Sequence, residues 1–167
     1  VREQMTGRGD DPGKLINTYA RGITKALEDR PDDMTVTVHM CRGNFKSSWI
    51  AEGGYEPVAE DMFAGVPVDG FFMEWDSERA GGFEPLRFAP RDKIVVLGLV
   101  SSKLPELETK DSLKRRVEEA SQYIPIENIC LSPQCGFASM VFGNLISEDD
   151  QWRKLELCAE TATEIWG

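Results

Sequence analysis

Residues 93–100 read KIVVLGLV, and this segment sets the strongest limit on how the chain can fold. A strand this apolar has to be covered on both faces, as the strands of parallel sheets are. Three other segments have the length and composition of strands: residues 34–40, 70–75 and 128–131. Helices are predicted for residues 11–27, 56–63 and 110–123, and from Asp149 onward. Strands that alternate with helices predict an α/β fold with a parallel sheet, either doubly wound or a barrel.

We predict that residues 1–167 form a single domain. A chain of this length can bury a substantial core, and it contains no internal repeat, low-complexity stretch or linker. One polar loop is long, residues 76–92. Loops of that length inside a compact domain are more often functional than idle.

Charge and composition exclude several classes of partner. The net charge of −10 argues against nucleic acid and anionic membrane surfaces. No apolar run approaches the ~20 residues that span a bilayer. No signal peptide is visible in the polar first residues, and we expect a cytoplasmic protein with reduced cysteines. Cys130 and Cys158 lie in apolar segments and are expected to be small buried hydrophobic residues.

The only histidine of the chain lies close to a cysteine at the end of the first predicted strand. Residues two apart in a strand point to the same face, so His39 and Cys41 can bind one ion together. Imidazole and thiolate are typical zinc ligands. Taken alone, however, such a pair is more often explained by packing or hydrogen bonding.

Two further metal-ligand residues lie where other predicted strands end. Glu74 closes the second strand, and Cys135 follows the last one. The carboxyl ends of parallel strands gather on one face, which brings these residues toward His39 and Cys41. A site built from separate strand ends looks catalytic rather than structural. Other roles stay open, because Glu74 can equally pair with a nearby arginine and Cys135 can be a turn residue.

Together the four side chains form a donor set for Zn²⁺: His39, Cys41, Glu74 and Cys135. Glu74 is the hardest and most replaceable ligand, so its catalytic role is that of a displaceable one. A substrate thiol in its place would be held as thiolate at neutral pH, although a free thiol has a pKa of about 8.5. Such a thiolate can attack an alkyl donor.

Five motifs resemble the C-terminal catalytic domain of cobalamin-independent methionine synthase, and most closely its shorter single-barrel relatives. They are HMCRGN at 39–44, WIAEGGY at 49–55, GFFME at 70–74, GLVSSK at 98–103 and LSPQCGF at 131–137. The similarity extends over the whole chain. It implies a zinc-dependent (β/α)8 barrel that transfers a methyl group from 5-methyltetrahydrofolate, in its polyglutamate form, to homocysteine to form methionine. It also implies that the four residues above are the zinc ligands.

The chain is shorter than the barrel of this family. A (β/α)8 barrel needs about 250 residues, whereas this chain supplies four clear strands and resembles the C-terminal half of a TIM barrel. The strands with the family's homocysteine amino-group contacts and much of its folate surface would precede Val1. Because a half-barrel leaves open strand edges and an exposed interior, we expect a homo-oligomer or a partner chain that supplies the missing half.

Two alternatives remain for the function. One is a cobalamin-linked thiol methyltransferase, which uses a similar zinc site on a related barrel; the motifs at 49–55 and 131–137 favour the methionine synthase relatives. The other is a non-catalytic zinc-binding remnant of the barrel. Smaller signals stay open. Arg42 and Asn44 can bind a carboxylate, and residues 101–103 can equally contact substrate or form a solvated loop. Trp75 can stack on a pterin ring, but core packing is the commoner role for such a residue.

Overall fold

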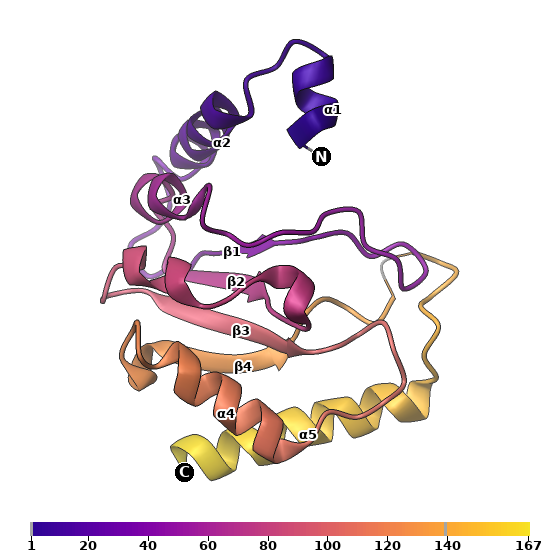
Figure 1. Cartoon of the computed structure of the whole chain (residues 1–167). Helices are drawn as coiled ribbons and strands as arrows, with labels where there is room; N and C mark the ends of the chain where they lie inside the picture. Colours follow the sequence, from indigo (N-terminus) through magenta and orange to yellow (C-terminus); the bar gives the residue numbers. More distant parts are fainter. Residues whose placement is uncertain (1, 139) are drawn as a thin grey trace.

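The computed structural model describes residues 2–138 and 140–167, and its centre is a four-stranded parallel sheet (Figure 1). The strands are β1 (Thr37–Met40), β2 (Gly70–Glu74), β3 (Ile94–Val100) and β4 (Ile129–Pro133). They lie in the order in which they occur along the chain, and each pairs in parallel with the next. The predicted α/β alternation and parallel sheet are therefore confirmed.

The two faces of the sheet differ in burial. On one face, Phe71, Val95 and Ile129 pack into the hydrophobic core with residues of the helices. On the other face, the register places His39, Phe72, Val96 and Cys130 in one row. His39 and Cys130 are exposed and Phe72 is half-buried, so this face is largely open. The prediction that Cys130 is buried is wrong, because its position in β4 turns it toward the open face; Cys158 is buried as expected.

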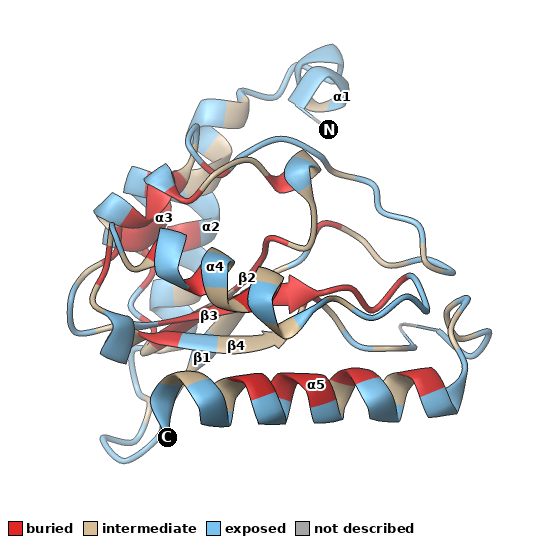
Figure 2. Cartoon of the chain, turned by 60° about the horizontal axis from the view of Figure 1, so that its bottom comes forward, coloured by how far each residue is buried: buried red, intermediate tan, exposed pale blue. Residues whose placement is uncertain are grey.

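Three long helices follow the prediction and begin at residues suited to the role. In α2 (Pro12–Ala26) the Asp11 carboxylate accepts from the Gly13 N–H, with proline in the first turn. Thr109 caps α4 (Lys110–Ala120), and Ser147 forms a capping box with Asp150 at the start of α5 (Glu148–Trp166). Figure 2 shows the buried residues of α5 along the side that faces the sheet. The short helix α1 (Arg2–Gly7) is not predicted by any pattern that we recognised.

Several boundaries differ from the prediction for local reasons. The strand predicted at 34–40 begins only at Thr37, because the N–H of Val36 is bound by the Asp69 carboxylate at 2.7 Å. The helix predicted at 56–63 is α3 (Ala59–Gly65), since a turn that closes from Tyr55 to Val58 precedes it. The predicted loop 76–92 contains two 3-10 helices, η1 (Glu78–Ala80) and η2 (Glu84–Phe88), and buries Phe83 and Leu86. The short helix η3 (Ile126–Asn128) leads into β4.

No helix in the described part of the chain combines the length and apolar character needed to cross a membrane.

The backbone of Gln134, just after β4, comes very close to Gly98 of β3. A Cβ at this position would be 2.7 Å from the Cα of Gln134 and 3.1 Å from the carbonyl oxygen of Met73. Because both neighbours are backbone or fixed to it, Gly98→Ala should lower the free energy of unfolding by about 1–3 kcal/mol in urea titrations. Gly22→Ala is the matched control: this glycine lies inside α2 with open space around it. We expect it to stabilise by about 0.5–1 kcal/mol, and equal effects at both positions would contradict the prediction.

Candidate metal centre

The four predicted metal-ligand residues meet at the carboxyl end of the sheet. His39 lies in β1 with Cys41 directly after the strand, Glu74 ends β2, and Cys135 follows β4. One potential ligand atom of each lies within 4.8 Å of those of the other three. The parallel topology thus brings together residues that are up to 96 positions apart in the chain.

The distances between these atoms fit a small tetrahedral ion. The two sulfurs of Cys41 and Cys135 are 3.6 Å apart, and Cys135 Sγ is 3.6 Å from His39 Nε2. Zinc with bonds of about 2.3 Å to sulfur and about 2.0–2.1 Å to nitrogen spaces such pairs by about 3.8 and 3.6 Å. His39 Nε2 and Glu74 Oε1 are 3.5 Å apart. One distance is shorter, 2.8 Å from Cys135 Sγ to Glu74 Oε1, which is a thiol hydrogen bond to the carboxylate. The donor set and its spacing therefore suit zinc.

Glu74 is a fully buried carboxylate with a partner on each oxygen. Oε1 accepts from the Arg42 N–H at 3.1 Å and from the Cys135 thiol, and Oε2 accepts from Gln134 Nε2 at 3.2 Å. Burial raises the pKa of Glu74, but hydrogen bonds from His39, Cys135, Arg42 and Gln134 outweigh it and bring the pKa down to about 2. Glu74 is therefore an anion at neutral pH, as a metal ligand must be.

The Glu74 carboxylate shifts the pKa values of His39 and Cys135. The hydrogen bond to Glu74 is the main reason that the pKa of His39 is raised, although burial acts in the opposite direction. Burial raises the pKa of the Cys135 thiol, and the adjacent Glu74 carboxylate raises it further.

These shifts predict how zinc affinity depends on pH. The imidazolium form of His39 cannot ligate, so affinity should fall as pH is lowered through the raised pKa of His39. With its raised pKa, Cys135 keeps its proton at neutral pH, and zinc has to displace it. Titration calorimetry at neutral pH in two buffers of different ionisation enthalpy should show release of at least one proton. An affinity that stays constant between about pH 6 and pH 8 would contradict the prediction.

Comparison with known proteins shows which family the chain matches. The catalytic-domain model of the cobalamin-independent synthases matches residues 20–148. The chain belongs to this family. Two Bacillus subtilis proteins, YxjG and YxjH, both described as uncharacterised, are 52% and 48% identical over 98% and 99% of this chain. The chain spans only 44% of the length of either relative.

Two solved structures show the fold of the family. A Listeria monocytogenes protein assigned as a vitamin-B12-independent methionine synthase is 38% identical and superposes with a TM-score of 0.74. That match covers 95% of this chain and 43% of the Listeria chain. A B12-independent methionine synthase from Shewanella, solved with selenomethionine, is 17% identical with a TM-score of 0.67, over 90% of this chain and 46% of that chain. The four-stranded sheet thus corresponds to half of a TIM barrel, as predicted.

Two buried side chains support Glu74 and were not predicted. The hydroxyl of Tyr55 accepts from the backbone N–H of Glu74 at 2.9 Å and from Arg42 Nε at 3.3 Å. The guanidinium of Arg42 packs over the Tyr55 ring, 4.2 Å from its centroid, and donates to the Gly53 carbonyl. Gln134, in contrast, contacts the Glu74 side chain, because its Nε2 donates to Oε2. Sequence alone offered only a weak signal, since Tyr55 and Gln134 both lie inside family-like motifs.

Other candidates take structural roles. The Arg42 guanidinium donates through Nε and one terminal nitrogen, and its other terminal nitrogen is buried without a hydrogen-bond partner among the described residues. Asn44 Nδ2 donates to the Gly136 carbonyl at 2.8 Å. Arg79 pairs with Asp76 at 2.8 Å, not with Glu74. Trp75 is 1% exposed and packs edge-on to Tyr55 in the core. Each of these contacts stiffens the loops around the ligand cluster.

Residues 101–103 are buried beside the cluster. Ser101 and Ser102 contact Gln134, and Lys103 is fully buried, with its Nζ donating to the Gly43 carbonyl at 2.9 Å. Lys103 therefore anchors the loop that follows Cys41. All three residues are buried, so the alternative that they form a solvated loop is wrong; contact with a substrate stays a prediction.

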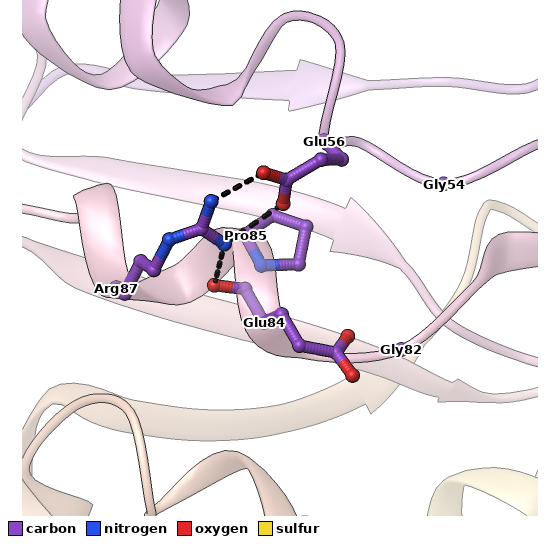
Figure 3. A pocket seen from close by; sticks show the side chains of 6 residues that line it. All are labelled: Gly54, Glu56, Gly82, Glu84, Pro85 and Arg87. Atoms are coloured by element: carbon purple, nitrogen blue, oxygen red, sulfur yellow. Dashed lines mark hydrogen bonds and ion pairs between the residues drawn. The ribbon is translucent and has the colours of Figure 1, made fainter.

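One surface hollow has candidate ligands in its lining, and another does not. A shallow one of about 290 Å³ is lined by His39, Phe72 and residues 132–136, so it opens directly onto the ligand cluster. Another, lined by Gly54, Glu56, Gly82, Glu84, Pro85 and Arg87, contains none of the four ligands (Figure 3). In this hollow Arg87 donates to the Glu56 carboxylate and to the Glu84 carbonyl. These bonds link the residues just before α3 to η2. We assign a structural role to the second hollow.

Proposed function

We propose that His39, Cys41, Glu74 and Cys135 bind one Zn²⁺ and that the centre activates a substrate thiol for methylation. The observation that carries the proposal is the convergence of four ligand atoms within 4.8 Å at the carboxyl end of a parallel sheet. Zinc bound there would hold a thiol as thiolate at neutral pH. Family membership supports homocysteine as the acceptor, 5-methyltetrahydrofolate as the donor and methionine as the product.

The residues of the chain have distinct roles in this proposal. His39, Cys41 and Cys135 are the permanent ligands, and Glu74 is the ligand that the substrate thiol replaces. When displaced, Glu74 keeps the Arg42 N–H and the Gln134 amide as partners. A buried carboxylate with both oxygens bonded is not left uncompensated. A site with two thiolate ligands needs reduced cysteines, and we propose the cytoplasm as its compartment.

We further propose that residues 1–167 act as one catalytic-domain segment that needs further barrel strands to be active. The relatives are more than twice as long as this chain. In addition, β1 and β4 are edge strands, and the row of His39, Phe72 and Cys130 leaves one sheet face largely open. The missing strands can come from a longer polypeptide, a second copy of this chain or a separate partner.

The test is methyl transfer from 5-methyltetrahydrofolate to homocysteine, measured as methionine formed. The zinc-loaded chain is assayed alone and after co-expression with the part of YxjG that lies outside the matched region. We expect little activity alone and methionine formation by the combined chains. Activity only with methylcobalamin would favour a cobalamin-linked methyltransferase, and zinc binding without activity in either form would favour a non-catalytic remnant.

A further inference from the structure

Gln134 lies between the end of β4 and Cys135, and it is only 2% exposed. Its backbone N–H donates to the Val100 carbonyl at 2.9 Å, which fixes it to the end of β3. Its side chain is bonded at both ends. Nε2 donates to Glu74 Oε2 at 3.2 Å, and Oε1 accepts from Ser101 Oγ at 3.0 Å and from the Ser102 N–H at 3.3 Å.

These contacts allow only one orientation of the amide. If it were flipped, the carbonyl oxygen would face the carboxylate of Glu74, and the NH2 group would face the N–H of Ser102. An acceptor would then face an acceptor and a donor would face a donor. Hydrogen bonds that are lost at a buried site cost the most free energy. The donor of Gln134 is therefore permanently directed at Glu74 Oε2.

The two oxygens of Glu74 consequently have different surroundings. Oε1 lies 2.8 Å from Cys135 Sγ and 3.5 Å from His39 Nε2, within the ligand cluster. Oε2 is bound instead to Gln134 Nε2, at 3.2 Å. Only one oxygen is thus presented to an ion in the cluster.

We propose that Gln134 is a positioning residue that makes Glu74 a one-oxygen, replaceable ligand. The inference rests on the proposed zinc centre and adds the reason why Glu74 is the ligand that can leave. The Gln134 amide holds Oε2 by a hydrogen bond, so an ion bound to Oε1 can gain the second oxygen only by competing with that bond. The same hydrogen bond remains when Glu74 is displaced, so the buried carboxylate keeps a partner in both states.

The experiment measures zinc affinity of the full chain by competition with a chromogenic chelator, in a double-mutant cycle. Gln134→Met keeps the side-chain length and removes the amide, and we expect it to weaken zinc binding about 10- to 100-fold, as loss of partners behind metal ligands does. In a Glu74→Ala background, where three ligands and water can still hold zinc, the same substitution should change affinity little. Gln122→Met, on an exposed glutamine after α4, is the matched control and should have no effect.

The outcomes separate the inference from the proposed function. An equal loss of affinity with and without Glu74 would overturn the positioning role, because Gln134 would then act through Cys135 or the loop. Failure of the wild-type chain to bind zinc would overturn the metal centre itself. If Gln134→Met does not fold, Ser101→Ala serves instead, since it removes one donor that fixes the amide and touches no ligand. Ser101→Ala should weaken zinc binding when Glu74 is present and leave it unchanged in the Glu74→Ala background; an equal loss in both backgrounds would overturn the role here too.

Discussion

Cys135→Ala is expected to lower zinc affinity by about a hundred- to a thousand-fold. Four-ligand zinc sites bind with about 10–16 kcal/mol, and one ligand's share of about 3–4 kcal/mol corresponds to that loss. Cys135 is also the most central ligand, because its sulfur has contacts with the ligand atoms of Cys41, His39 and Glu74. Equilibrium competition with a chelator gives the affinity, and elemental analysis gives the zinc content per chain.

Cys130→Ala is the matched control. This cysteine lies within β4, the strand that Cys135 follows, but it is on the open face in register with Val96 and is not among the clustered ligands. We expect its removal to leave zinc affinity unchanged. If Cys130→Ala lost zinc while Cys135→Ala kept it, the proposed ligand set would be wrong. If wild type prepared anaerobically with zinc bound none, no ligand assignment would survive.

The arrangement of the four candidate ligands could be predicted because it depends on topology more than on detail. Parallel strands place their carboxyl ends at one edge of the sheet, so the strand ends at Met40, Glu74 and Pro133 had to converge. The apolar composition of residues 93–100 was enough to predict β3 and the parallel sheet. An error of a few residues at a strand start, as at Thr37, does not move the carboxyl end and so did not affect the site.

The surroundings of the ligands could not be predicted in the same way. The hydrogen bond from the Gln134 amide to the Glu74 carboxylate and the one from the Glu74 N–H to the Tyr55 hydroxyl depend on side-chain orientation between segments that are 60 and 19 positions apart. No period or local motif encodes such pairs. The error at Cys130 has a similar origin, since an apolar neighbourhood in sequence does not reveal that one face of the sheet stays open.

Glu108→Ala is expected to have the largest effect on stability. Lys154 of α5 is fully buried, and its ammonium group lies 3.1 Å from Glu108 Oε2 and also donates to the Glu106 carbonyl. Glu108 Oε1 accepts the Ser101 N–H at 2.7 Å, at the end of β3. Removing the carboxylate leaves a buried charge without its counter-charge, which costs about 3–5 kcal/mol. Urea unfolding at neutral pH measures the loss.

Two further variants show whether the buried charge is the cause. Lys154→Met should destabilise less than Glu108→Ala, because the side chain of Glu108 is 21% exposed and can reach water when its partner is absent. The double variant Glu108→Leu with Lys154→Met should recover most of the stability, since apolar pairs often replace buried ion pairs without loss. If the double variant were as unstable as the sum of the two single changes, Glu108 would stabilise the fold mainly through Ser101. The free energy lost would then belong to the end of β3, beside Gln134, rather than to the contact with α5.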